Sequence, residues 1–139
     1  MEYCAIIKFD KADKVWYVEF PNHPNINTFG DSLEHALYMA EDALNGVLEF
    51  ELERGQSLPK ATIMKGKDVY KIPVAPHIAL AYDLKSARAD KPQKEVASIL
   101  GISYQAYQRF ENPRKSNPSV KTLERVAKVL GKRLELRLV

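Results

Sequence analysis

The sequence predicts an α+β protein built from two modules: a β-β-β-α-β domain at residues 1–75, then an all-helical domain at residues 76–139 that ends in a strand. Three observations indicate this division. Runs of strand-forming residues precede one long amphipathic helix in the first half, whereas every long segment after His77 has helical periodicity. Pro73 and Pro76 interrupt the chain where the pattern changes. The sign of the net charge changes there as well.

Four strands are expected in the first module. Two segments rich in β-branched and aromatic residues, 2–9 and 15–20, flank a polar turn and therefore predict a hairpin. A short third strand fits the segment around Asn25–Phe29, which follows a loop rich in proline and asparagine. The last strand, at residues 69–74, is limited by Pro73, because proline cannot donate a hydrogen bond to a sheet.

One long helix is expected between the third and fourth strands. Asp31 or Ser32 caps its N-terminus, Glu34 places a carboxylate in its first turn, and Gly55 closes it. Its apolar residues recur at steps of three and four positions: Leu33, Ala36, Leu37, Ala40, Ala43, Leu44, Val47, Leu48 and Leu52. Acidic residues occupy the other side, so we expect one face of the helix to pack on the sheet.

The second module is predicted to contain four helices and a C-terminal strand. The helices are expected at Ile78–Ala89, Pro92–Leu100, Ser103–Glu111 and Ser119–Leu130. The tail, Arg133–Val139, alternates polar and apolar residues without a break and therefore predicts a strand.

Composition excludes several classes of protein. No apolar run approaches the roughly 18 residues that a membrane-spanning helix needs, and the charged N-terminal segment does not resemble a signal peptide. The single cysteine, Cys4, excludes an internal disulfide and a cysteine-rich zinc site, and we expect it in the core. The three histidines are scattered along the chain. We therefore expect a cytoplasmic protein with no metal, no cofactor and no membrane partner.

The net charge of the two modules differs in sign. Residues 1–75 carry 8 Lys and Arg against 12 Asp and Glu, a net charge of −4, whereas residues 76–139 carry 13 against 6, a net charge of +7. This asymmetry suggests two modules with different partners, with nucleic acid as the candidate for the basic one. The alternative is that small domains differ by several charges by chance.

Residues 93–112 contain the residue types that a helix-turn-helix requires. Ala97 is small where the next helix must pass closely, and Gly101 permits the left-handed backbone of a short turn. Ile102 fills the corner, and Ser103 caps the helix that follows. This combination predicts two helices joined by a tight turn.

On these residues the segment 78–131 resembles the phage-repressor (Xre-type) helix-turn-helix family. The family pattern runs Q-x-x-x-A-x-x-x-G-[IV]-S, then a recognition helix that ends R-[IFW]-E-N, a basic loop, and N-P-S-x-x-T-L. The matching residues are Gln93, Ala97, Gly101, Ile102, Ser103, Arg109, Phe110, Glu111, Asn112, Asn117, Pro118, Ser119, Thr122 and Leu123. Pro113 departs from the pattern, because the family usually has glycine there, and this departure concerns the shape of the loop.

The resemblance implies DNA binding with the third helix in the major groove. The positions that match base-reading residues are Tyr104, Gln105, Arg109 and Gln108. Arginine can form two hydrogen bonds with guanine, and glutamine can do the same with adenine. Contacts with phosphate are implied for Gln93 and Ser103 and suit the loop residues Arg114 and Lys115. The alternative is a basic face that is merely solvated.

The predicted tail strand needs a partner, because a lone strand leaves its backbone groups unpaired. Leu134, Leu136 and Leu138 would share one apolar face. Pairing with the same strand of a second subunit would form a two-fold dimer, alone or within a higher homo-oligomer, and such symmetry suits a palindromic operator. The alternative is pairing within the same chain.

The first module contains carboxylates that could suggest catalysis: Asp10, Asp13, Glu19, Asp31 and Glu34. Asp10 and Asp13 lie in a polar turn, however, and Asp31 and Glu34 are explained as residues at a helix start. The histidines have no nucleophile or orienting partner near them in the sequence. We therefore predict no catalytic residue and no enzymatic activity.

Three features of the first module form a recognisable pattern. The second strand ends in Phe20-Pro21, the segment Thr28-Phe29-Gly30-Asp31-Ser32-Leu33-Glu34 precedes the helix, and Ala36, Ala40 and Ala43 follow the spacing A-x-x-x-A-x-x-A. On these features residues 3–60 resemble the HicB antitoxin family. The loop Asn22-His-Pro-Asn-Ile-Asn departs from it, because the family usually has glycine and a cysteine or small residue there. A HicB-type module before an Xre-type helix-turn-helix is an arrangement that the family uses.

The resemblance implies a partial RNase H-like fold without catalysis. It also implies a partner, a small basic HicA-like ribonuclease toxin whose active site is occluded, and repression of the shared operon. Residues 1–53 carry 3 Lys against 11 Asp and Glu, a net charge of −8, which complements a toxin that binds RNA. The candidates for the toxin-binding surface are Asn22, His23, Asn25, Asn27, Glu34 and Glu41.

The sequence therefore predicts an antitoxin that also represses transcription, and two alternatives stay open. A stand-alone transcriptional regulator would sense a small molecule with its first module, and this requires an apolar pocket with a few convergent polar groups. A nuclease on the RNase H-like fold would require clustered carboxylates.

Overall fold

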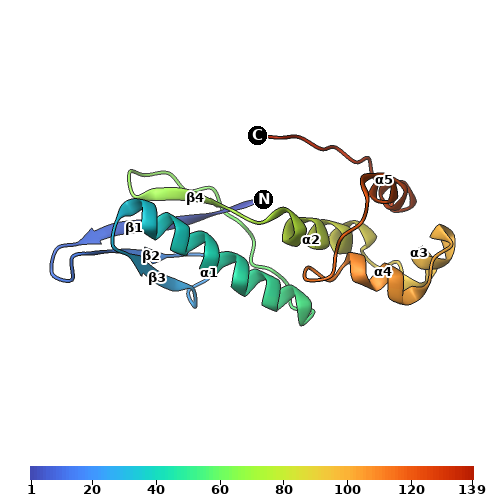
Figure 1. Ribbon diagram of the computed structural model, residues 1–139, viewed down its shortest axis with the longest axis horizontal. Helices are drawn as coiled ribbons and strands as arrows, with labels where there is room; N and C mark the ends of the chain where they lie inside the picture. Colours follow the sequence, from blue (N-terminus) through green and yellow to red (C-terminus); the bar gives the residue numbers. More distant parts are fainter. The chain divides into compact units, whose positions relative to one another are not determined.

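The computed structural model describes all 139 residues, which form two compact units, Met1–Pro76 and His77–Val139. The expected α+β architecture is confirmed: strands and one long helix make up the first unit, and shorter helices make up the second (Figure 1). The division falls after Pro76, one residue beyond the boundary expected from the sequence. No helix of either unit is both long enough and apolar enough to cross a membrane.

The first unit contains a four-stranded antiparallel sheet in the order β3-β2-β1-β4. Its strands are β1 (Glu2–Asp10), β2 (Val15–Glu19), β3 (Asn27–Gly30) and β4 (Val69–Pro73). Ile7 on β1 lies opposite Val18 on β2, and both side chains are buried. Because neighbouring residues on a strand point to opposite faces, this pairing places the apolar positions of both strands on the same face.

Helix α1 (Leu33–Glu53) covers that face of the sheet (Figure 1). Ser32, one of the two expected caps, accepts a hydrogen bond from the backbone N–H of His35 at 3.0 Å. The buried residues of the helix form one row: Ala36, Ala40, Leu44, Leu48 and Leu52. A Cβ on Gly30 would lie 2.3 Å from the backbone nitrogen of Ala36, so only glycine allows β3 and α1 to meet this closely.

The second unit is a small helical domain with its own core. Its helices are α2 (Pro76–Arg88), α3 (Gln93–Leu100), α4 (Tyr104–Phe110) and α5 (Val120–Val129). The buried residues of this core are Leu84, Val96, Ala97, Leu100, Tyr107, Leu123 and Val126. They come from all four helices, so the direction of each helix depends on packing against the others.

The expected C-terminal strand does not form within the single chain: residues 132–139 form neither strand nor helix, so the alternative of pairing within the same chain is wrong. A strand exists only as part of a hydrogen-bonded ladder, and no segment of this chain pairs with the tail. Leu134 is half-buried against the helical core, whereas Leu136 is 60% exposed and Leu138 is fully exposed. The apolar face predicted from the alternation is therefore covered at only one of its three leucines.

Candidate functional site

The turn between α3 and α4 has the geometry expected of a helix-turn-helix. Gly101 adopts the left-handed conformation, with φ of +71°, and its N–H donates to the carbonyl of Ser98 at 3.1 Å. Half-buried Ile102 packs on the core at the corner. Ser103 then caps α4 by accepting a hydrogen bond from the N–H of Ala106 at 3.1 Å. These contacts determine the direction in which α4 leaves the turn.

The four predicted base-reading residues lie on one side of α4. Gln105, Gln108 and Arg109 are exposed, and Tyr104 is half-buried at the start of the helix. Positions three and four residues apart share a face of a helix, so these side chains are neighbours. Tyr107 points the opposite way and is completely buried in the core.

Tyr104 also contacts a cation that the sequence analysis did not assign to the site. The ammonium of Lys94, at the start of α3, lies 5.4 Å from the centre of the Tyr104 ring. A cation over the face of an aromatic ring is a stabilising arrangement. It places a positive charge from α3 next to the first residue of α4.

A largely buried ion pair connects the end of α2 with the end of α4. The guanidinium of Arg88 donates two hydrogen bonds to the carboxylate of Glu111, at 2.7 and 2.9 Å, and the two side chains are only 15% and 5% exposed. The side-chain amide of Gln93 donates to the same carboxylate at 3.1 Å. Because Gln93 is the first residue of α3, one carboxylate holds three helices together.

The surroundings of Glu111 lower its pKa. Burial disfavours its charged form, but the hydrogen bonds from Arg88 and Gln93 outweigh that effect, so the pKa of the carboxyl lies below its usual value. Burial, together with the neighbouring carboxylate of Glu111, raises the pKa of Tyr107 above its usual value. The residues that hold α4 in place thus include an ionised carboxylate, Glu111, and a neutral phenol, Tyr107, at neutral pH.

The loop after α4 accommodates the departure from the family pattern. Pro113 is buried, and the backbone of residue 113 does not take a positive φ. The side-chain oxygen of Asn112 accepts the N–H of Arg114 at 3.0 Å, and the N–H of Lys115 donates to the Asn112 carbonyl at 3.1 Å. The loop therefore closes without the left-handed residue that glycine would supply, and the side chains of Arg114 and Lys115 are exposed.

The side chains of the two residues implied to contact phosphate, Gln93 and Ser103, both make hydrogen bonds within the second unit. The Ser103 oxygen accepts a hydrogen bond within the cap, so its hydroxyl proton is available for an outside acceptor. The amide nitrogen of Gln93 instead donates to Glu111. Gln93 therefore helps to hold the helices together, a role that was not predicted from the sequence.

Three of the six candidate residues for toxin binding make contacts within the first unit. Asn22 accepts a hydrogen bond from Thr62 at 2.9 Å, and Asn27 donates to the carbonyl of Pro24 at 2.9 Å. His23 is only 11% exposed, and its Nε2 atom lies 2.5 Å from a carboxylate oxygen of Glu51 on α1. The contacts of Asn22 and His23 hold the loop between β2 and β3 against the rest of the unit, and the contact of Asn27 closes the loop on itself.

The other three candidates are exposed, but the six do not form one patch. Asn25 lies in the loop, whereas Glu34 and Glu41 lie on α1. The loop meets the helix at Glu51, which follows Glu34 by 17 residues, or roughly 25 Å at the usual rise of a helix. The structure therefore separates His23 from Glu34 by most of the length of α1.

A row of exposed residues on α1, not predicted from the sequence, lies opposite the buried row. Its members are Glu34, Tyr38, Asp42, Gly46 and Phe50, and we call it the outer row. Two signals could have identified it: a glycine in the middle of a long helix and two aromatic residues on its polar side. Elsewhere, no group of three or more His, Cys, Asp or Glu side chains has an arrangement that could hold a metal ion.

Comparisons with known proteins match both units. Residues 2–80 match the family described as HicB-like antitoxin of bacterial toxin-antitoxin system, and residues 84–136 match a helix-turn-helix family. Antitoxin HicB 2 of Photorhabdus laumondii is 32% identical over 132 residues, which cover 94% of this chain and 92% of that protein. Antitoxin HicB 1 of the same organism is 32% identical over 123 residues, which cover 87% and 77%.

Two solved structures are also similar. One is a chain of a toxin-antitoxin complex from Streptococcus pneumoniae, with a TM-score of 0.49 at 13% identity, covering 78% of this chain and 93% of that chain. The other is the antitoxin HicB of Burkholderia pseudomallei, with a TM-score of 0.47 at 14% identity, covering 78% and 90%.

The geometry of the second unit and its family match define a regulator of the helix-turn-helix class, joined to a separate α+β unit. The match of the first unit and the identity along almost the whole chain then determine the family. The chain belongs to the HicB family of antitoxins.

Proposed function

We propose that the chain neutralises a HicA-like ribonuclease toxin and represses transcription of its own operon. The DNA half of the proposal rests on one observation: Tyr104, Gln105, Gln108 and Arg109 share the outer side of a helix whose direction is set by a buried ion pair and a tight turn. This is the arrangement by which a helix-turn-helix presents side chains to the major groove.

Each of these four residues of α4 has a chemistry that suits a base edge. The guanidinium of Arg109 can donate two hydrogen bonds to guanine, and the amides of Gln105 and Gln108 can each donate to and accept from adenine. Tyr104, held beside Lys94, offers an apolar ring to a thymine methyl group. The proposal assigns sequence preference to these four residues.

Contacts with the DNA backbone come from residues around α4. The Ser103 hydroxyl can donate to a phosphate, and Arg114 and Lys115 place two cations on the loop that follows the helix. Gln93 acts indirectly, because its amide donates a hydrogen bond to Glu111 and thereby helps to position α4. These contacts do not depend on the base sequence, and the DNA affinity that they provide falls as the salt concentration rises.

We assign self-association to the tail. Leu136 and Leu138 are exposed in a segment whose backbone has no ladder, although its alternation is that of a strand. Pairing with the tail of a second copy would satisfy those backbone groups and bring the exposed leucines together with Leu134. A two-fold pair presents two copies of α4 to two half-sites of an operator.

The toxin half rests on the family and on charge. A ribonuclease binds a polyanion and therefore carries a cationic surface, which the net charge of −8 over residues 1–53 complements. Asn25, Glu34 and Glu41 are exposed for direct contact. Asn22, His23 and Asn27 support the loop from within. The proposal includes no catalytic residue, metal or cofactor in this chain.

Co-expression tests the proposal. The chain is produced with the product of the short basic reading frame next to its gene, and the purified sample is analysed by size-exclusion chromatography, RNA cleavage and binding to the DNA upstream of the pair. We expect one complex, suppressed cleavage and salt-sensitive, sequence-specific DNA binding. Free chains with undiminished cleavage would overturn the toxin half, and equal affinity for unrelated DNA would overturn the repressor half.

A further inference from the structure

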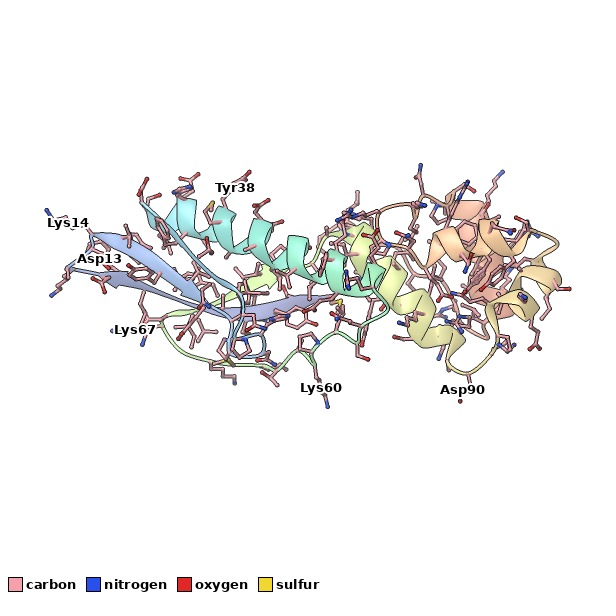
Figure 2. All side chains as sticks on the ribbon, turned by 90° about the horizontal axis from the view of Figure 1, so that it is seen from below. Asp13, Lys14, Tyr38, Lys60, Lys67 and Asp90 are labelled. Atoms are coloured by element: carbon pink, nitrogen blue, oxygen red, sulfur yellow. The ribbon has the colours of Figure 1, made fainter.

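Helix α1 has two opposite rows of residues with opposite environments. The buried row packs on the sheet, and every member of the outer row is exposed. Each outer-row residue stands about 200° around the helix from the buried residue two positions further on. Figure 2 shows Tyr38 pointing away from the sheet, on the far side of the helix. The outer row is therefore a continuous ridge with four-residue steps, the kind of ridge with which helices pack against other elements.

Gly46 in this ridge has no explanation within the fold. It lies in the interior of a 21-residue helix, where glycine is the least favourable residue after proline. A Cβ at this position would have no atom within 4 Å, so no neighbouring element of the chain requires glycine. Its φ is not positive, so the backbone does not require glycine either. The residue makes a notch in the exposed ridge that serves nothing inside the protein.

Two aromatic side chains flank the notch. Tyr38 is 67% exposed and Phe50 is 49% exposed, and they lie twelve residues apart, or about 18 Å along the helix. The guanidinium of Arg54 lies 5.1 Å from the centre of the Phe50 ring, so this ring already accepts a cation on its face. Exposed aromatic residues beside a place of close approach are typical of the anchors of a protein interface.

The charge of the helix identifies the kind of partner. Residues 33–53 contain six Asp and Glu and no Lys or Arg. One of the six, Glu51, is turned toward His23, and the others are exposed or half-exposed. A second copy of the same helix would bring like charges together across the ridge, which disfavours self-association through this face. A cationic protein surface would meet complementary charge.

We propose that the outer row of α1 is the docking ridge for the toxin, with a cationic helix or backbone segment of the toxin seated in the notch at Gly46 between Tyr38 and Phe50. This inference rests on the proposed function and deepens it. It moves the centre of the toxin interface from the loop at residues 22–27 to the outside of the helix. Of the earlier candidates, it keeps Glu34 as a member of the ridge and Glu41 as its neighbour.

Gly46→Ala gives the sharpest test, because it should change stability and binding in opposite directions. Alanine favours the helix and fits in open space, so we expect the thermal midpoint of the full-length chain to rise by about 4 °C. The added methyl group fills the notch, so we expect the affinity for the co-expressed product of the adjacent reading frame to fall roughly tenfold. If Gly46 had only a structural role, alanine would not raise the thermal midpoint and lower the affinity at the same time.

Two further variants test the rest of the ridge, each with a matched control. Tyr38→Ala should weaken binding roughly 30-fold, the scale of an interface hot spot, whereas Ile63→Ala, which removes an 88% exposed side chain outside the ridge, should not. Asp42→Lys should weaken binding roughly tenfold and reduce its salt dependence. Asp90→Lys makes the same change of charge at an exposed position of the second unit and should leave binding unchanged.

The outcomes separate the inference from the proposed function. If the wild-type chain does not bind the adjacent product, the proposed function is overturned. If the wild-type chain binds and Gly46→Ala and Tyr38→Ala bind equally well, only the docking ridge is overturned. A change in self-association of these variants, without a change in toxin binding, would also overturn it, because the ridge would then belong to a contact between copies.

Discussion

The outer sides of α1 and α4, to which we assign recognition of the toxin and of DNA, are built in opposite ways. Helix α4 has seven residues, and a largely buried ion pair and a capped turn hold it in place. Helix α1 has 21 residues and packs on the sheet through a row of apolar side chains, with the contact between Glu51 and His23 near its C-terminal end. Hydrogen bonds to base edges tolerate little error in direction, so the short helix needs a rigid polar frame. Charge and shape complementarity over a protein surface needs area instead, which the long helix provides.

Arg88→Ala should produce the largest effect, and it should affect one unit only. Removing the guanidinium leaves the Glu111 carboxylate buried without its ion-pair partner, which costs about 3–5 kcal/mol of unfolding free energy. Denaturant unfolding of the full-length chain should show the second unit destabilised and DNA binding lost, with toxin binding retained. Lys85→Ala removes the same charge from the last turn of the same helix and serves as the control. Equal effects of the two variants would contradict a special role for the ion pair.

Deleting residues 134–139 should have the next largest effect. Without tail pairing, two DNA-binding units no longer engage an operator together, and affinity should fall by roughly 100-fold. Sedimentation together with titration of the operator checks this expectation, and toxin binding by the first unit should be unchanged. Arg137→Ala, a single change in the tail that keeps its leucines, should behave as wild type. A truncated chain that remains dimeric would show that another surface makes the dimer.

Arg109→Ala should cost about 1–3 kcal/mol of specific DNA binding and relax the preference at one base position. Lys115→Ala is the informative comparison, because loss of a phosphate contact should weaken binding to all sequences alike and reduce the salt dependence by about one unit. Competition assays with a library of operator variants measure both. If Arg109→Ala behaves like Lys115→Ala, the arginine contacts the DNA backbone and not a base.

The smallest expected effect is a dependence of stability on pH in the second unit. The pKa of Glu111 is lower in the folded chain than its usual value of 4.5, so its ionised form stabilises the fold above that pH. This stabilisation is lost as the pH falls below 4.5 and through the lowered pKa of the folded state. Unfolding midpoints measured down this range should decrease for wild type and show a shallower acid slope for Glu111→Gln. Equal slopes would remove Glu111 from the acid response.

The elements of both units could be predicted from the sequence to within a few residues, because each depends on local physics. Ser32 and Ser103 accept hydrogen bonds from the helices that follow them, as expected of caps. Gly101 adopts the left-handed conformation that the sequence predicts for this turn. The tail is the exception, since alternation predicts an apolar face but does not supply the partner strand that a ladder needs.

The sequence by itself determined the order of strands and helices, the family resemblance and the residues on the outer side of α4, because periodicity and spacing depend only on neighbours along the chain. Only the tertiary structure decided which polar side chains pair with one another within the protein. His23 contacts Glu51, which is 28 positions away in the sequence, and Arg88 contacts Glu111, which is 23 positions away. No local pattern could therefore pair them. The same holds for Gly46. The sequence shows a glycine within a helix, but only the tertiary structure shows that no other part of the chain fills the space beside it.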